Sequence, residues 1–206
     1  QFIHGSEVPP VLVSPFTSLP RLSLRNVWNI AFSAERFVFA GFSILLVATG
    51  IYLYRFAVNM PFQDEWDAAS SLLTQGFAPE WWLSKHNEHR FIVGRVLWGL
   101  LMTATGFDFR AGGWLTLVLL ATSAGGLLLA VRKVRGHSSF TDVLVPALLL
   151  NAGHCFNLLM GYQVVFTAFT VCGCGLIASL LQVQPGSVFR TGLWGGDWLV
   201  LLVGNG

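Results

Sequence analysis

The sequence predicts an all-α protein that crosses a membrane several times. Hydrophobic residues make up 54% of the 206 residues, and charged residues only 11%, whereas soluble domains carry about 25%. Two uncharged runs, residues 37–54 and 111–131, are long enough to cross a bilayer as helices. A third apolar region, residues 143–189, contains no Asp, Glu, Lys or Arg. We therefore expect a polytopic membrane protein with about four complete transmembrane helices.

The first span is expected at residues 37–54. Arg21, Arg25 and Arg36 precede this run, and basic residues favour the cytoplasmic side of a span. We therefore predict that residues 1–36 form a cytoplasmic N-terminal segment and that residues 55–110 form an outer loop.

The second span is expected at residues 111–131, directly before Arg132, Lys133 and Arg135. If this basic cluster is cytoplasmic, only one crossing fits between residues 55 and 131. The apolar segment 91–106 is short and is interrupted by Arg95, so we predict an amphipathic helix at the outer interface. The alternative, a full span, would place the basic cluster outside.

Residues 143–189 leave room for two more spans, which we place near 142–156 and 164–182, joined by an outer turn. Another apolar run begins at residue 193 and predicts a partial fifth span over 193–206. The membrane domain is thus expected over residues 37–206. Because the sequence starts with Gln1 and stops within an apolar run, we expect it to be the N-terminal part of a larger protein.

The composition excludes some classes of function. The net charge is only +2, so nothing favours nucleic-acid binding. Cys155, Cys172 and Cys174 lie in apolar segments, and a structural zinc site would need a second pair of ligands. We interpret these cysteines as small buried residues.

An acidic cluster, Asp64, Glu65 and Asp67, follows the first span. Each carboxylate would cost about 3 kcal/mol in hydrocarbon, so these acids must face water or a polar cavity. Two interpretations remain open. The acids can stabilise the first turn of a helix through its dipole, with Trp66 at the lipid headgroups. Alternatively, one can be a partly desolvated general base or a metal ligand.

A second polar cluster, "SKHNEHR", contains Lys85, His86, Glu88, His89 and Arg90. His86 and His89 could bind zinc together with a carboxylate such as Asp64. The same segment could hold a phosphate through Lys85 and Arg90. A polar cap on an interfacial helix is the structural alternative.

Between the two clusters, Trp81 and Trp82 indicate a second helix at the lipid headgroups, because Trp favours that layer. A site in this loop would therefore meet a lipid-linked substrate. His154 and Asn157 could line the same cavity, although a packing role is the more common one for such a histidine.

A long span, an outer loop with adjacent acids, interfacial helices and further spans together resemble the N-terminal part of a GT-C superfamily membrane glycosyltransferase, the group that includes protein O-mannosyltransferases and aminoarabinose transferases. The sequence "DEWD" stands where that family carries its acidic motif. The resemblance implies Asp64 or Glu65 as the catalytic residue, and sugar transfer with inversion from a polyprenyl-phosphate donor on the outer face. The acceptor stays unknown.

The same resemblance implies that the donor is bound by residues from the acidic cluster, the second cluster and the later turn "GYQ". These residues are Asp67, Lys85, His86, Glu88, His89, Arg90, Tyr162 and Gln163. A divalent cation is a possible cofactor, with Asp64, His86 and His89 as candidate ligands. Membrane lipids are the other expected partners, and the expected location is a bacterial inner (plasma) membrane with a cytoplasmic N-terminus.

Two alternative functions are weaker. A non-enzymatic polytopic protein, such as a transporter or scaffold subunit, is the first alternative. Transporters usually place ionisable groups within their spans, and the predicted spans here are nearly free of charge. The second is a zinc-dependent hydrolase using His86 and His89, but the sequence lacks an HExxH pattern.

Overall fold

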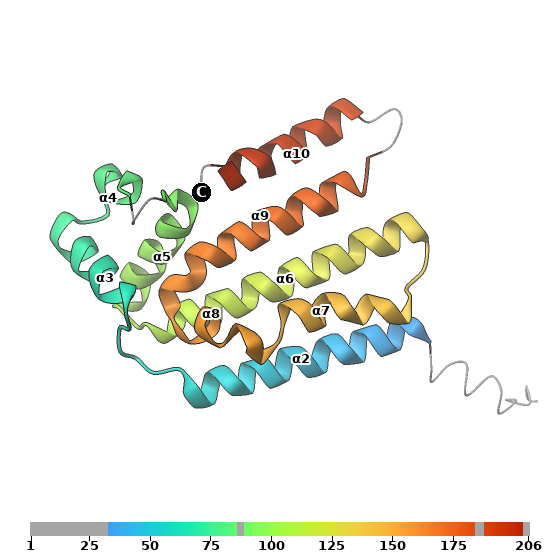
Figure 1. Ribbon diagram of the computed structural model, residues 1–206, viewed down its shortest axis with the longest axis horizontal. Helices are drawn as coiled ribbons and strands as arrows, with labels where there is room; N and C mark the ends of the chain where they lie inside the picture. The colour runs from blue at the N-terminus through green and yellow to red at the C-terminus, as the bar shows by residue number, and fades with distance from the viewer. Residues whose placement is uncertain (1–32, 86–88, 184–187, 204–206) are drawn as a thin grey trace, which may run out of the picture. The chain divides into compact units, whose positions relative to one another are not determined.

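The computed structural model of the chain describes residues 33–85, 89–183 and 188–203, and in these ranges it contains helices and no strand (Figure 1). The α-helices are α2 (Ala34–Phe56), α3 (Asp64–Gln75), α4 (Pro79–Leu83), α5 (Ile92–Thr105), α6 (Arg110–Arg135), α7 (Leu144–Leu149), α8 (Cys155–Leu159), α9 (Val164–Leu180) and α10 (Val188–Val203). Three 3-10 turns join them, namely η1 (Phe140–Val143), η2 (Ala152–His154) and η3 (Gly161–Gln163).

Four helical segments are long and apolar enough to cross a membrane. They are Ala34–Phe56, Arg110–Arg135, Phe140–Leu159 and Gly161–Leu180. Each contains or nearly coincides with one predicted span, so the predicted fold class is confirmed: the chain is an all-α polytopic membrane protein. Residues 193–203 of the predicted fifth segment are in α10, which begins at Val188, and residues 204–206 lie outside the described residues.

The long helices pack side by side in the unit formed by residues 34–206. Helix α6 packs against α9 and α2, and α9 also packs against α10 (Figure 1). Helices α3, α4 and α5 lie at the end of the bundle where α2 finishes and where α6 and α9 begin (Figure 1). Among the described residues between Arg55 and Val131, only α6 is long and apolar enough to cross a membrane.

Helix α5 lies within the apolar segment 91–106, which is predicted to be an amphipathic helix at the outer interface. Its 14 residues give a length of about 21 Å, which is shorter than the roughly 30 Å of bilayer hydrocarbon. The helix packs against α9, α6 and α4 at the loop end of the bundle. Its length is therefore below that of a membrane-spanning helix.

The third span is a broken helix. After α7, Leu150 leaves helical geometry, and the Asn151 side chain binds the backbone by donating to the carbonyls of Ala147 and Leu148. His154 Nε2 also binds the Leu148 carbonyl at 2.9 Å, and Asn157 contacts its other ring nitrogen. Side chains that satisfy carbonyls at a helix end compete with continued helix formation. These contacts fit the packing interpretation of His154.

Close helix contacts in the loop half of the bundle require glycine. A Cβ on Gly112, in the first turn of α6, would lie 2.3 Å from Cα of Gly161. A Cβ on Gly94, in α5, would lie 2.3 Å from Cα of Val165. These two contacts fix the starts of α6 and α9 against each other and α5 against α9.

Replacing Gly112 by Ala should destabilise the protein by about 1–3 kcal/mol, because the added methyl group meets backbone that cannot rotate away. Gly125→Ala, in the same helix, is the matched control: no described atom lies within 4 Å of the position of its Cβ. Thermal unfolding in detergent should show a lower midpoint for Gly112→Ala only. Equal midpoints for the two variants would contradict the close contact.

Candidate functional site

The acidic cluster is divided between two surfaces of α3. Glu65 is 1% exposed and faces the core together with Ala68, Ala69 and Leu72. Asp64 and Asp67 are exposed. The three acids therefore have different environments, although they lie within one helical turn.

The buried carboxylate of Glu65 fastens α3 to the fourth span. Its Oε2 accepts a hydrogen bond from the Phe62 N–H at 2.9 Å, and its Oε1 accepts one from the Tyr162 N–H at 3.0 Å. Tyr162 belongs to η3, the first turn of the helical segment that continues as α9. A carboxylate at this position satisfies N–H groups that have no intrahelical partner and interacts favourably with the helix dipole.

Burial raises the pKa of Glu65 above its ordinary value of 4.5. Hydrogen bonds from the backbone of Phe62, Tyr162 and Gly161 oppose this effect, but burial is the larger cause. The contribution of this raised pKa to the free energy of unfolding is fully present at pH values below the pKa that Glu65 has in the unfolded chain. The contribution is lost as the pH rises through the pKa of Glu65 in the folded protein. The ionised form is therefore the more costly one to bury.

Arg95 is a second buried charge at the same end of the bundle, with 5% exposure. Its Nε donates to the Tyr162 hydroxyl at 3.2 Å, and its Nη1 donates to the Trp81 carbonyl at 2.7 Å. The same nitrogen donates to the Ser84 carbonyl at 3.0 Å and contacts the Ser84 hydroxyl. The guanidinium also lies 5.7 Å from the centre of the Trp81 ring, which is within the range of a cation–π interaction.

Sequence reasoning treated Arg95 only as an interruption of an apolar run and missed its role. The sequence does indicate such a role, because a single charged side chain within a short apolar helix needs polar partners. The partners themselves come from Trp81, Ser84 and Tyr162 and cannot be read from spacing.

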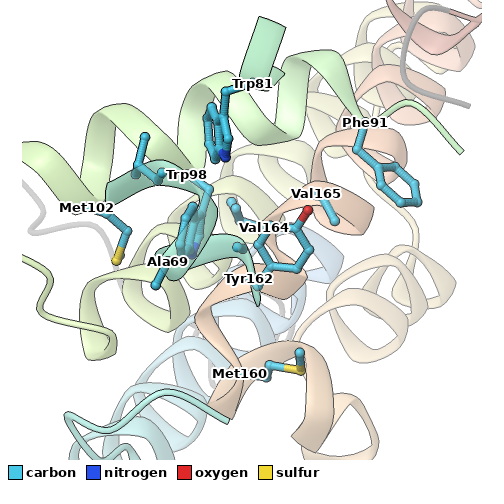
Figure 2. Close-up of a cluster of buried hydrophobic side chains, with 11 residues drawn as sticks. Ala69, Trp81, Phe91, Trp98, Met102, Met160, Tyr162, Val164 and Val165 are labelled. Carbon is cyan, nitrogen blue, oxygen red and sulfur yellow. The ribbon is translucent and has the colours of Figure 1, made fainter. Parts of the chain in front are cut away.

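A hydrophobic cluster surrounds this network (Figure 2). The Trp98 and Tyr162 rings meet edge to face with centroids 5.3 Å apart, and Trp98 also stacks with Trp81. Trp81 is 1% exposed, so the prediction that it lies at the lipid headgroups is wrong. Its ring is held in the core by the Ser71 hydroxyl, which accepts from Nε1 at 2.9 Å. Trp66, in contrast, is 60% exposed, as a headgroup anchor would be.

The second polar cluster is only partly described. Lys85, His89 and Arg90 are exposed, whereas His86 and Glu88 lie outside the described residues. The residue before Lys85 is Ser84, which binds Arg95, and Arg95 binds Tyr162, which binds Glu65. The two clusters are therefore connected through Tyr162.

The predicted turn residues have different positions. Tyr162 is 1% exposed, so it supports the site from within the core. Gln163 is half-buried, and its amide contacts the Met160 sulfur at 3.4 Å.

The metal prediction gains no support from the described part of the chain. Within it, no three His, Cys, Asp or Glu side chains are grouped closely enough to hold an ion. One candidate ligand, His86, is not described.

Two grooves lie beside the loop helices. The first, of about 370 Å³, is apolar and is lined by Tyr52, Phe56, Val58, Met60, Phe62, Cys155, Phe156, Leu159 and Met160. It adjoins the Glu65 contact, because the Phe62 N–H binds that carboxylate. The second, of about 550 Å³, has the exposed Asp108–Arg110 ion pair in its lining, with an N–O distance of 2.7 Å. The Arg110 guanidinium lowers the pKa of Asp108.

Comparisons with protein-family models, with curated proteins and with solved structures find no match for this chain.

Replacing Glu65 by Gln should destabilise the protein by about 1–3 kcal/mol. The amide can accept from one backbone N–H, but its NH₂ group leaves the other N–H buried and unsatisfied. The control is Asp67→Asn, because Asp67 lies two residues later in the same helix and is exposed. This variant should cost no more than about 1 kcal/mol, through the lost interaction of the carboxylate with the helix dipole. Thermal unfolding of the two variants in detergent checks this difference, and an unchanged midpoint for Glu65→Gln would rule out the anchoring role.

Proposed function

We propose that this chain is part of a GT-C type glycosyltransferase that moves a sugar from a polyprenyl-phosphate donor to an acceptor on the outer face of a membrane. The main support is the placement of α3. Its buried acid anchors the helix to a span, and its exposed acids are thereby held at the loop end of the bundle. This arrangement is suited to chemistry at the lipid boundary, because a fixed carboxylate there can meet a lipid-linked substrate and a water-borne acceptor.

In this proposal Asp64 is the general base. Its carboxylate takes the proton of the acceptor hydroxyl, and the acceptor oxygen attacks the anomeric carbon as the bond from that carbon to the phosphate oxygen breaks. The sugar inverts, and polyprenyl phosphate leaves with the bonding electron pair. Glu65 is the less suitable of the two acids, because its oxygens are already occupied by backbone N–H groups.

The donor phosphate is assigned to Lys85, His89 and Arg90, whose exposed side chains can stabilise the developing negative charge. Asp67, His86, Glu88 and Gln163 complete the proposed substrate contacts, and the buried Tyr162 supports α3 through its hydrogen bond to Glu65. The apolar groove beside Phe62 is large enough for part of a lipid chain. A divalent cation remains a possible cofactor.

Replacing Asp64 by Asn in the full-length protein should lower the rate of sugar transfer by about 10²–10⁴-fold, the usual contribution of a general base. The matched control is Glu80→Gln, which neutralises another exposed acid of the same loop. Transfer of radiolabelled sugar from a purified polyprenyl-phosphate donor measures both variants. Full activity of Asp64→Asn would favour the non-enzymatic alternative, a transporter or scaffold subunit.

The proposed orientation places the loop end of the bundle outside a bacterial inner membrane and the Arg132–Arg135 end in the cytoplasm. Single cysteines at Gln75 and His137, both exposed positions, test it. Gly136 is avoided because its φ of 81° strains other residues. A membrane-impermeant maleimide should label Gln75→Cys in intact cells, and His137→Cys only after lysis. The reverse pattern would refute the orientation.

A further inference from the structure

The 550 Å³ groove that contains the ion pair of Asp108 and Arg110 lies between the end of α2 and the start of α6. We call it the Asp108–Arg110 groove. Its volume is within the range of about 300–1,000 Å³ that is usual for ligand sites. Its lining continues from the ion pair along α6 to Val118, which lies roughly 12 Å further along the helix at about 1.5 Å per residue. The groove therefore has a charged end and a long apolar part.

The apolar part of the groove is built on closely packed helices. Leu53 of α2 lines it and is fully buried, and a Cβ on Gly113 of α6 would lie 3.0 Å from the Leu53 side chain. Trp114 forms another part of the lining, and its ring lies 3.9 Å from the position of a Cβ on Gly50 of α2. Trp114 and Val118 are nevertheless 41% and 55% exposed, so the groove is open to a ligand along α6.

The ion pair at the charged end is accessible and has unused hydrogen-bonding capacity. The side chains of Arg110 and Asp108 are 50% and 31% exposed. Arg110 donates to the carboxylate through Nε and Nη2, which leaves three of its five side-chain N–H donors without a partner among the described residues. Asp108 accepts these two bonds and one from the Arg110 backbone N–H, so about one of its four acceptor positions remains. The pair can therefore bind an anion and an ammonium group together without being broken.

A second ion pair on the same helices indicates the level of the groove in the bilayer. Arg110 begins α6, and Arg132, in the last turn, is paired with Glu35 of α2 at 2.6 Å. About 33 Å separates the two arginines along α6, which is close to the roughly 30 Å of bilayer hydrocarbon. Tyr54 also lines the groove and is 80% exposed, as is usual for tyrosines at the membrane interface. With α6 as a span, the Asp108–Arg110 pair lies at the level of the lipid phosphates, and the apolar part of the groove extends into the hydrocarbon.

We propose that the Asp108–Arg110 groove binds a membrane phospholipid whose headgroup carries both a phosphate and a primary ammonium group, as that of phosphatidylethanolamine does. Arg110 binds the phosphate through charge-assisted hydrogen bonds. Asp108 accepts from the ammonium group, and the first part of an acyl chain lies along Trp114 and Val118.

The charges of the groove select this class of lipid over others. The ion pair is neutral as a whole, so a headgroup with one charge of each sign complements it, whereas an anionic headgroup would place uncompensated negative charge beside the Asp108 carboxylate. A diacylglycerol would match only the apolar part. The site does not depend on the proposed sugar transfer, because none of the residues assigned to that reaction lines this groove.

The test measures binding of lipids to the full chain in neutral detergent by titration calorimetry. The probes are short-chain phosphatidylethanolamine, phosphatidylglycerol and diacylglycerol with the same acyl chains. Phosphatidylethanolamine should bind about tenfold more tightly than either of the other two, because only its headgroup can bind both charges. Equal binding of phosphatidylethanolamine and diacylglycerol would overturn the proposal, and so would equal or tighter binding of phosphatidylglycerol.

A variant of Asp108 locates the site. Asp108→Asn keeps an oxygen that can accept from the Arg110 backbone N–H but removes the negative charge. Binding of phosphatidylethanolamine should weaken about tenfold, whereas binding of phosphatidylglycerol should not weaken, so the preference between the two lipids is lost. The matched control, Glu80→Gln, neutralises another exposed acid of the same loop and should keep the preference. A preference that survives in Asp108→Asn, or that is lost in both variants, would refute the site.

A measurement on the unaltered chain covers the case in which Asp108→Asn does not fold. A phosphatidylethanolamine with a photoreactive diazirine in the acyl chain is irradiated with the protein, which is then digested with trypsin. The label should appear in the peptide of residues 111–132, which contains Trp114 and Val118. Unlabelled phosphatidylethanolamine should compete for this labelling more strongly than phosphatidylglycerol does. A label confined to other peptides, or equal competition by the two lipids, would contradict the proposal.

Discussion

Tyr162 connects the buried side chains of Glu65 and Arg95, and the loop end of the bundle depends on that connection. Its N–H binds the Glu65 carboxylate, and its hydroxyl accepts from Arg95. The acid and the base are thus kept apart by one aromatic side chain and compensated by different groups. Removing either partner would leave a polar group buried without its hydrogen bonds, which is more costly than never having buried the pair. The ring itself adds packing through its edge contact with Trp98.

The anchoring of α3 also explains a strained residue. Gln63, directly before the helix, has a φ of 49°, a conformation that costs about 1–3 kcal/mol for a residue with a side chain. This turn brings the Phe62 N–H to the Glu65 carboxylate. The helix then presents Trp66 and Leu73, both well exposed, on a surface separate from its buried residues. One short helix therefore combines a core contact, an apolar exposed surface and two exposed acids.

Glycines, together with breaks in the helices, set the distances between helices at the loop end of the bundle. Because the third span is interrupted at Leu150 and ends at Leu159, the backbone around Gly161 can approach Gly112 of α6 directly. A continuous helix would keep its backbone surrounded by side chains at the usual interaxial distance of about 8–10 Å. The close contact places the Tyr162 N–H within reach of α3.

The sequence by itself determined the membrane class and the four segments long enough to span, because run length and charge can be read locally along the chain. It also located the acids and the basic segment. Only the tertiary structure decided which acid is buried. Asp64, Glu65 and Asp67 look alike in sequence, and Glu65 differs only because α9, nearly 100 residues later, begins beside it.

The same holds for the glycines and tryptophans. Gly125, Gly126 and Gly173 look in sequence like helix-packing positions, yet no described atom lies within 4 Å of where their Cβ atoms would be. A Cβ on Gly94 or Gly112, in contrast, would collide with the backbone of another helical segment. Trp66 and Trp81 are equally plausible headgroup anchors in sequence, but one is exposed and the other forms the core. Intrinsic preference limits where a residue can lie in a membrane protein, and long-range packing then selects one position, since burial depends on partners that are distant in the chain.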